Sequence, residues 1–325
     1  MKRIIISPGD PAGVGPDICL KAFKRNISKN SYPVFLGDPD LFEERAKCLN
    51  IDIDFQEYRE EEDLLQNKFY IKPRILKEKV IPGTPSPSYA QYLIDILKEA
   101  IHLNLSGEFS ALVTGPLNKE IINQGGIAFK GHTEILAQET NTKKVVMLLA
   151  NESLKVALAT THEPLKDVPS LITEDHISDC INIIHNDLKS KWNIAKPNIK
   201  VLGLNPHAGD GGYIGKEDEE IILPAIKRSK RNGIKVTGPV SADTAFINFN
   251  HESDVILAMF HDQGLPVIKS TGFGESINVT LGLPLIRTSV DHGTAYDLSG
   301  KQEANESSFL KAYELASRLT LKSCE

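Results

Sequence analysis

The sequence predicts an α/β fold built on mostly parallel sheets, and two patterns along the chain support this prediction. Short apolar runs rich in β-branched residues alternate with segments of helical spacing, which is the pattern of strands connected by helices. Most of the apolar runs then end in polar loops that contain glycine, as strands do at the ligand-binding edge of a parallel sheet. The length of 325 residues allows one large or two medium domains.

The predicted strands are apolar runs bounded by turn residues. They are KRIIIS (2–7), YPVFLG (32–37), ALVTG (111–115), VVMLLA (145–150), LKVALAT (154–160), IKVLGLN (199–205) and VILAMF (255–260). The fifth run follows the fourth after only Asn151, Glu152 and Ser153, which predicts an antiparallel hairpin. A purely doubly wound domain has no need of such a hairpin, so this pair indicates a second domain in the middle of the chain.

The predicted helices follow from apolar residues at intervals of three and four. Tyr89, Leu93, Ile96, Leu97 and Ala100 form one such stripe, and a second runs through 177–188. Further helices are expected over 17–23, 40–49 and, as the closing element, 307–319.

Composition excludes several classes of protein. The net charge of −6 argues against general binding of nucleic acid, whose phosphates attract basic surfaces. No apolar run approaches the roughly 18 residues of a membrane span, and the apolar run 4–6 is too short for the core of a signal peptide. We therefore expect a cytoplasmic protein. The four cysteines are scattered without a CxxC pair, so we expect neither disulfides nor a thiolate metal site.

Three of the polar loops that follow predicted strands contain a histidine: His162, His207 and His261. One histidine in such a loop is more often a structural residue than a ligand. Three at equivalent positions predict a site for a divalent cation, because neutral imidazole is the commonest ligand for zinc-like ions. The remaining histidines considered, His102, His176, His185 and His251, lie in helical or surface contexts, where a structural role is expected.

Familiar cofactor and hydrolase motifs are absent from the chain. In GDPAGVGP (9–16), Ile18 stands where the dinucleotide fingerprint GxGxxG would need its third glycine. Neither HExxH nor GxSxG occurs. Near the third histidine, Lys269, Asn278 and Arg287 would suit a phosphate or carboxylate if they converged, although solvated surface charges would explain the two cations equally well.

Seven motifs in order resemble those of the 4-hydroxythreonine-4-phosphate dehydrogenase family, the NAD-dependent enzymes of pyridoxal phosphate biosynthesis. The motifs are GDPAGVGPD (9–17), TGPLNK (114–119), FKGHTE (129–134), NPHAGDGG (205–212), GPVSADT (238–244), HDQGLPVIK (261–269) and NVTLGLPLIRTSVDHGTAYD (278–297). The resemblance implies a two-domain α/β/α fold of the isocitrate and isopropylmalate dehydrogenase type, with mostly parallel sheets and an active-site cleft between the domains. We place the first domain at 1–128 plus 283–325. The second, at 129–282, is expected to contribute metal ligands and the dimer interface.

The resemblance also assigns site residues. His162, His207 and His261 match the ligands of one divalent metal (zinc, cobalt, magnesium or manganese), one of them supplied by the partner chain of a homodimer with its active site at the interface. His132, Thr133, Lys269, Asn278 and Arg287 match the substrate-binding positions. Asp243 lies beside them and is the candidate proton acceptor. One position departs from the family, which usually has glutamate where this chain has Asp210.

The implied reaction is NAD-dependent oxidation of 4-phosphohydroxy-L-threonine, with NADP as an alternative cofactor. Hydride leaves the carbon bearing the hydroxyl β to the carboxylate, and the product, 2-amino-3-oxo-4-phosphooxybutanoate, loses carbon dioxide to give 3-amino-2-oxopropyl phosphate. Three alternatives remain open at this point. They are a dehydrogenase of the same family acting on another phosphorylated hydroxy acid such as 4-phospho-D-erythronate, a metal-dependent hydrolase, and a non-catalytic protein that binds phosphate or metal.

Overall fold

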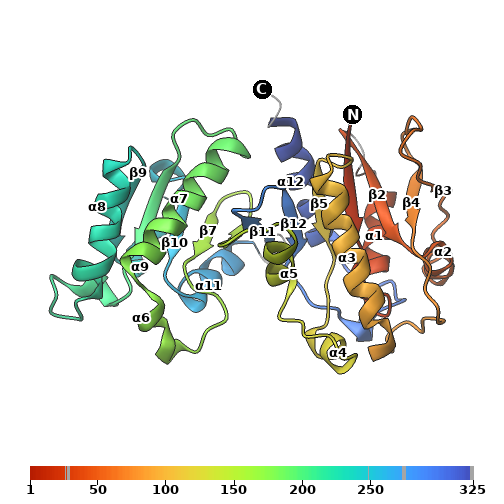
Figure 1. Ribbon diagram of the computed structural model, residues 1–325, viewed down its shortest axis with the longest axis horizontal. Coiled ribbons are helices and arrows are strands. Elements are labelled where there is room, and N and C mark those ends of the chain that lie inside the picture. Colours follow the sequence, from red (N-terminus) through yellow and green to blue (C-terminus); the bar gives the residue numbers. More distant parts are fainter. Residues whose placement is uncertain (26, 28–29, 248, 273–275, 323–325) are drawn as a thin grey trace. The chain divides into compact units, whose positions relative to one another are not determined.

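The computed structural model describes residues 1–325 except 26, 28–29, 248, 273–275 and 323–325, so Cys324 lies outside the described residues, as does the side chain of His251. The chain forms two compact units (Figure 1): unit 1 is Met1–Lys143 with Leu283–Glu325, and unit 2 is Lys144–Gly282. The division differs from the sequence-based boundary at 128/129, because residues 129–143 belong to unit 1. His132 and Thr133 are therefore residues of unit 1.

Unit 1 contains a parallel sheet with the strand order β3-β4-β2-β1-β5-β12. In its described part, each strand pairs with its neighbour in parallel, and the central β1 places Ile5 opposite Val34 on one side and Leu112 on the other. Ile4, Ile5 and Ile6 have no exposed surface. The strands are β1 (Lys2–Ser7), β2 (Ser31–Gly37), β3 (Phe55–Glu57), β4 (Phe69–Pro73), β5 (Ala111–Thr114) and β12 (Arg287–Val290).

Helices cover both faces of this sheet. Both α3 and α12 pack against β1 and β5, and α3 lies in front of the strands in Figure 1. The predicted stripe is the buried face of α3 from Leu93 to Ala100, and the buried Tyr89 directly precedes this helix. The predicted closing helix is α12, so both predictions are confirmed. The helices of unit 1 are α1 (Gly15–Lys24), α2 (Pro39–Cys48), α3 (Ala90–Leu105), α4 (Lys119–Gln124), α5 (His132–Glu139) and α12 (Ser307–Lys322).

Unit 2 contains a mixed sheet with the strand order β11-β6-β7-β10-β8-β9. The predicted hairpin is confirmed: β6 and β7 are antiparallel, with Leu148 opposite Ala157. β11 adds to β6 in the antiparallel sense, while β7, β10, β8 and β9 pair in parallel. The strands are β6 (Val146–Ala150), β7 (Lys155–Leu158), β8 (Asn198–Leu202), β9 (Lys235–Val240), β10 (Val255–Ala258) and β11 (Ile277–Leu281).

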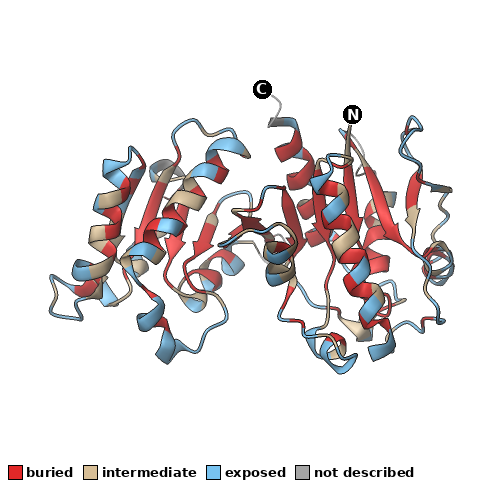
Figure 2. Ribbon diagram, viewed as in Figure 1, coloured by how far each residue is buried: buried red, intermediate tan, exposed pale blue. Residues whose placement is uncertain are grey.

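The helices of unit 2 pack on its sheet, with buried strands and exposed outer helix faces visible in Figure 2. α11 lies close to β7 and β10 because Gly264 has no side chain; a Cβ there would lie 2.6 Å from Cγ1 of Val156. None of the helices in the described ranges is long and apolar enough to cross a membrane. The helices are α6 (Val168–Leu171), α7 (Glu174–Ser190), α8 (Leu223–Arg231), α9 (Ala242–Ala245), α10 (Phe249–Glu252) and α11 (His261–Thr271). The predicted α/β fold with mostly parallel sheets is thus confirmed.

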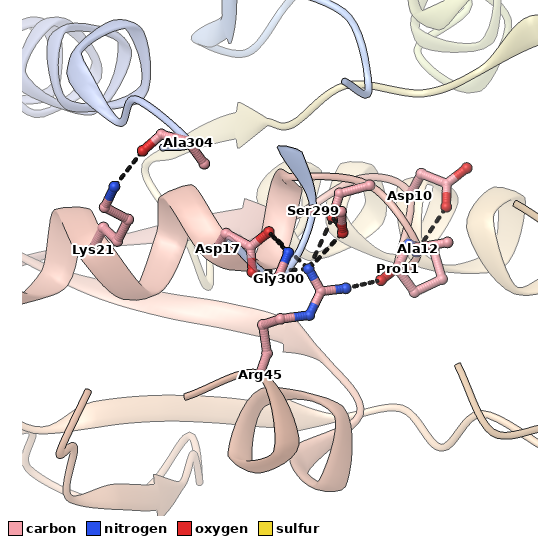
Figure 3. Close-up of polar contacts among 10 residues, drawn as sticks. Asp10, Pro11, Ala12, Asp17, Lys21, Arg45, Ser299, Gly300 and Ala304 are labelled. Carbon is pink, nitrogen blue, oxygen red and sulfur yellow. Dashed lines mark hydrogen bonds and ion pairs between the residues drawn. The ribbon is translucent and has the colours of Figure 1, made fainter. Parts of the chain in front are cut away.

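A buried ion pair joins four segments of unit 1 (Figure 3). Nη1 of Arg45, on α2, donates to both carboxylate oxygens of Asp17, on α1, at 2.8 and 2.7 Å. Nη1 also donates to Oγ of Ser299, and Nη2 donates to the carbonyl of Pro11. The two charged side chains are 1% and 0% exposed. This network holds the loop after β1 against α1, α2 and the segment near Ser299.

We expect Arg45→Met to destabilise the protein by about 3–5 kcal/mol, because it leaves the Asp17 carboxylate buried without its counter-charge. Urea unfolding followed by circular dichroism measures the change. The matched control is Arg59→Met, which removes an exposed ion pair with Glu62 and is expected to cost less than about 1 kcal/mol. Equal, small losses in both variants would contradict this account of the network.

Candidate functional site

Two of the three candidate metal ligands lie side by side in unit 2. His162 follows β7 and His261 follows the neighbouring parallel strand β10, so both loops leave the same edge of the sheet. Their ring centroids are 5.5 Å apart. Nδ1 of His261 lies 2.7 Å from Oδ1 of Asp262; an N–H donated there leaves Nε2 with the lone pair that a metal requires. The donor chemistry of this pair fits a zinc-like divalent cation.

Hydrogen bonds between the ends of β7 and β10 place this pair. The amide of Ala159 donates to the carbonyl of Ala258 at 2.8 Å. The amide and the hydroxyl of Thr160 both donate to the carbonyl of Met259, at 3.1 and 2.7 Å. The ladder thus continues past the last strand residues, which fixes the start of both loops.

His176 supports the same loop from α7. Its Nε2 lies 2.7 Å from the carbonyl oxygen of Ala159, and burial lowers the pKa of the imidazole. A neutral ring that donates to this carbonyl has a structural role, as the helical context of His176 suggested.

The third candidate, His207, lies in a loop with unusual backbone geometry. The loop follows β8, and its φ angles are 54° at His207, 52° at Ala208, 81° at Gly209, 44° at Asp210, 64° at Gly211 and 86° at Gly212. Residues with a side chain rarely adopt this left-handed region. Such outliers persist only where the surroundings impose them and often mark functional sites.

The left-handed loop is held at its start by the buried side chain of Asp218. Its carboxylate accepts from the amides of Leu204 and Asn205, at 2.8 and 3.1 Å, and from Nδ2 of Asn205 at 2.9 Å. His207 itself is exposed. Across the ranges that the structure describes, no group of three or more histidine, cysteine, aspartate or glutamate side chains is placed to hold a metal. A single chain therefore brings together His162 and His261 but does not add His207 to them.

Asp243, the candidate proton acceptor, is exposed on the short helix α9. It accepts a hydrogen bond of 2.6 Å from Oγ of Ser241. This bond, and to a lesser extent the charge of His207, hold the pKa of the carboxyl below its usual value. The side chain is a carboxylate at neutral pH, with reduced basicity.

Unit 1 contains a second group of candidate residues, which is positively charged. Arg287 on β12 is only 3% exposed, and its Nε and Nη2 donate to Oγ1 of Thr114 at 3.1 and 2.6 Å. Burial lowers the pKa of Arg287 to about 9, so the guanidinium is still charged at neutral pH. His132 begins α5, and its pKa lies well below the usual value because of burial and then the charges of Arg287 and Lys119. This environment suits a phosphate or carboxylate.

Lys119 is a residue of this group to which the sequence analysis gave no role. It is the last residue of the TGPLNK motif and the first of α4. A Cβ added to Gly131 would lie 3.7 Å from its Nζ, so the ammonium group lies near the start of α5. The signal in the sequence was the lysine at the end of a glycine-bearing loop after a strand.

The other predicted substrate residues lie on separate elements. Thr133 follows His132 in α5 of unit 1. In unit 2, Lys269 is exposed in the last turn of α11, and Asn278 lies on β11 opposite Leu149.

Glycines in the loops after β1 and β5 allow these two loops to pack on each other. A Cβ at Gly9, where φ is 89°, would lie 2.3 Å from the carbonyl oxygen of Pro116; one at Gly115 would lie 1.9 Å from that of Pro8. The amide of Asp10 donates to the carbonyl of Pro116 at 3.0 Å. These contacts account for Gly9 and Gly115 without a dinucleotide fingerprint.

Comparison with known proteins gives relatives of nearly the same length. A 4-hydroxythreonine-4-phosphate dehydrogenase from Yersinia enterocolitica is 46% identical over 330 residues, covering 99% of this chain and 98% of that protein. One from Pseudoalteromonas atlantica is 46% identical over 310 residues, covering 94% of each. Among solved structures, the 4-hydroxythreonine-4-phosphate dehydrogenase of Klebsiella pneumoniae has a TM-score of 0.91 at 32% identity, covering 98% of this chain and 100% of that chain.

A more distant structure shares the fold alone. A branched-chain phosphotransacylase from Enterococcus faecalis has a TM-score of 0.55 at 11% identity, with full coverage of both chains.

The family model for "Pyridoxal phosphate biosynthetic protein PdxA" matches residues 29–316. With that match and the 46% identity to full-length relatives, the chain belongs to the PdxA family of pyridoxal phosphate biosynthetic proteins.

Proposed function

We propose that this protein is an NAD-dependent dehydrogenase that oxidises 4-phosphohydroxy-L-threonine in the biosynthesis of pyridoxal phosphate. Its family membership and its relatives' activity support an oxidoreductase of this kind. The observation that carries the proposal is the pair His162 and His261, which lie together at the carboxyl ends of neighbouring parallel strands. Sites for ligands occur at that edge of such sheets.

His162, His261 and His207 are the proposed ligands of one divalent cation. His162 and His261 lie together within one chain, and the described part of that chain adds no third ligand to them, so His207 is proposed to reach the site from a second copy in a homodimer. Zinc, cobalt, manganese and magnesium all suit imidazole and oxygen ligands to differing degrees. When bound, the cation supplies Lewis acidity that lowers the pKa of the substrate hydroxyl and stabilises the negative charge formed on decarboxylation.

The chain's cationic and polar side chains are proposed to bind the anionic groups of the substrate. The guanidinium of Arg287 can form two parallel hydrogen bonds with a phosphate or carboxylate. His132 is neutral at pH 7, so its ring nitrogens can donate one hydrogen bond and accept another. Thr133, Lys269 and Asn278 are proposed as further contacts to the same substrate, and Lys119 contributes to the positive potential around His132.

A dehydrogenase of this kind requires a nicotinamide cofactor to accept the hydride. NAD is the proposed cofactor, with NADP as the alternative. The chain's contribution is to orient the substrate carbon that loses the hydride.

Asp243 remains the proposed proton acceptor for the substrate hydroxyl. Its lowered pKa makes it ionised but weakly basic, whereas an efficient general base has a pKa near the working pH. Unchanged turnover in Asp243→Asn would exclude this role.

The deciding experiment measures NADH formation by the purified protein with 4-phosphohydroxy-L-threonine and with 4-phospho-D-erythronate. Each is assayed before and after chelation and after metal is added back. Metal-dependent reduction of NAD with the amino substrate supports the proposal. Faster turnover of 4-phospho-D-erythronate would replace the proposed substrate with that compound. No reduction of NAD with either compound would overturn the proposal. Metal-dependent hydrolysis without nicotinamide would favour a hydrolase.

His207→Ala is expected to abolish tight metal binding and oxidation while the fold is retained, because the exposed side chain carries a proposed ligand and no core packing. Titration calorimetry with Zn²⁺, the NADH assay and circular dichroism measure the three properties. His102→Ala, at an exposed histidine that contacts Glu139, is the matched control and should bind Zn²⁺ as the wild type does. If His207→Ala binds Zn²⁺ with the affinity of the wild type, His207 is not a ligand of the metal.

Arg287→Lys is expected to raise KM for 4-phosphohydroxy-L-threonine by roughly 10- to 100-fold. Lysine keeps the positive charge but lacks the planar guanidinium that forms two parallel hydrogen bonds with an anion. The loss of one hydrogen bond between charged groups costs about 1.5–3 kcal/mol. Steady-state kinetics give the value, with the exposed Arg59→Lys as the control. An unchanged KM would mean that Arg287 does not contact the substrate.

Binding of the phosphorylated substrate is expected to raise the pKa of His132. In the free protein that pKa lies below 6.5, so the ring is neutral at pH 6.5 and above. An adjacent anion favours the imidazolium form, so the complex should take up a proton at a pH where the ring of the free protein is still neutral. Imidazole chemical shifts followed by NMR with and without substrate test this; identical titrations would show that no anion binds beside His132.

A further inference from the structure

Gln263 connects the ends of two strands that precede candidate metal ligands. Its Oε1 accepts a hydrogen bond of 2.7 Å from the amide of Met259, two residues before His261. Its Nε2 donates a hydrogen bond of 2.7 Å to the carbonyl of Gly203, four residues before His207. One amide side chain thus holds the backbone at the ends of β10 and β8.

The position of Gln263 in α11 makes this bridge possible. His261 is the first residue of the helix and Gln263 the third, and the preceding Phe260 provides no side-chain cap. Glutamine at the third helical position commonly reaches back to an amide at the helix start. Here Oε1 of Gln263 accepts from the Met259 amide, while Nε2 donates to the carbonyl of Gly203 at the end of another strand. Helix capping alone would require only the acceptor.

The backbone of Gly203 is closely packed on several sides, so the position of its carbonyl is fixed. Its amide donates to the carbonyl of Val240 on β9 at 2.8 Å. A Cβ there would lie 2.6 Å from Cα of Ala208, in the left-handed loop, and 2.7 Å from Oδ1 of Asp218. The contact with Gln263 therefore reaches the backbone on which the His207 loop packs.

From these contacts we infer that Gln263 is a positioning residue for the metal sites of the proposed dimer. Within unit 2 it fixes the His261 loop, which serves one site, relative to the His207 loop, which serves the site of the second copy. The inference depends on the metal site proposed above. Partners that orient metal ligands typically change metal affinity by roughly 10- to 100-fold when they are lost. Gln263 has the same role here through the backbone rather than through an imidazole.

The test is Gln263→Met, which keeps the length of the side chain and removes both hydrogen bonds. Titration calorimetry of the metal-free dimer with Zn²⁺ alone should show a dissociation constant at least about 10-fold higher than that of the wild type. Amide hydrogen exchange gives a second readout, because the Met259 amide should exchange faster once its acceptor is lost.

The matched control is Asn151→Leu. Asn151 is also an amide that joins two segments of unit 2, since its Oδ1 accepts from the Leu154 amide and its Nδ2 donates to the Ile268 carbonyl at the far end of α11. This variant should lose stability while its affinity for Zn²⁺ stays within about 2-fold of the wild type. If Gln263→Met does not fold, Gln263→Asn keeps the amide but is one methylene too short to span both partners.

The outcomes separate the inference from the proposed function. Wild-type protein that does not bind Zn²⁺ would overturn the metal site itself. Wild-type binding combined with unchanged affinity in Gln263→Met would overturn the positioning role alone. Equal loss of affinity in Gln263→Met and Asn151→Leu would also overturn it, because general destabilisation would then explain both.

Discussion

The candidate metal site depends on the parallel pairing of β7, β10 and β8. Parallel neighbours end at the same edge of a sheet, and this pairing brings His162 and His261 to a ring distance of 5.5 Å. Thr160 extends the pairing beyond the strands through Met259, and Gln263 links Met259 to Gly203. Backbone and side-chain hydrogen bonds therefore fix the starts of the loops that carry the candidate ligands.

The two units, each taken by itself, contain groups of different chemistry. Unit 2 supplies the imidazoles of His162 and His261, which suit a divalent cation. Unit 1 supplies the buried guanidinium of Arg287, and burial, together with the charges of Arg287 and Lys119, lowers the pKa of His132. This positive environment suits an anion. A phosphorylated hydroxy acid carries both a hydroxyl for a cation and phosphate and carboxylate groups for the cationic residues. Both kinds of group are ones that the proposed substrate would require.

Apolar runs and helical periodicity predicted many of the elements, and several strands, β4, β11 and β12 among them, were missed. The helices α3, α7 and α12 were predicted from the spacing of their apolar residues. The hairpin of β6 and β7 was predicted from two apolar runs that are joined by only three residues. β12 was missed because it buries Arg287, Thr288 and Ser289, a composition typical of a loop. For the site, histidines in loops after strands identified candidate ligands. The left-handed backbone at His207 and the bridge made by Gln263 depend on tertiary contacts that no local pattern contains.

X-ray diffraction at the zinc absorption edge, from crystals of the protein grown with Zn²⁺, would test the central claim most directly. The account predicts one strong anomalous peak per site, about 2.0–2.1 Å from a ring nitrogen of His162 and of His261, with His207 of a second copy completing the set. A peak elsewhere, or a zinc ion bound by only one of these histidines, would contradict it.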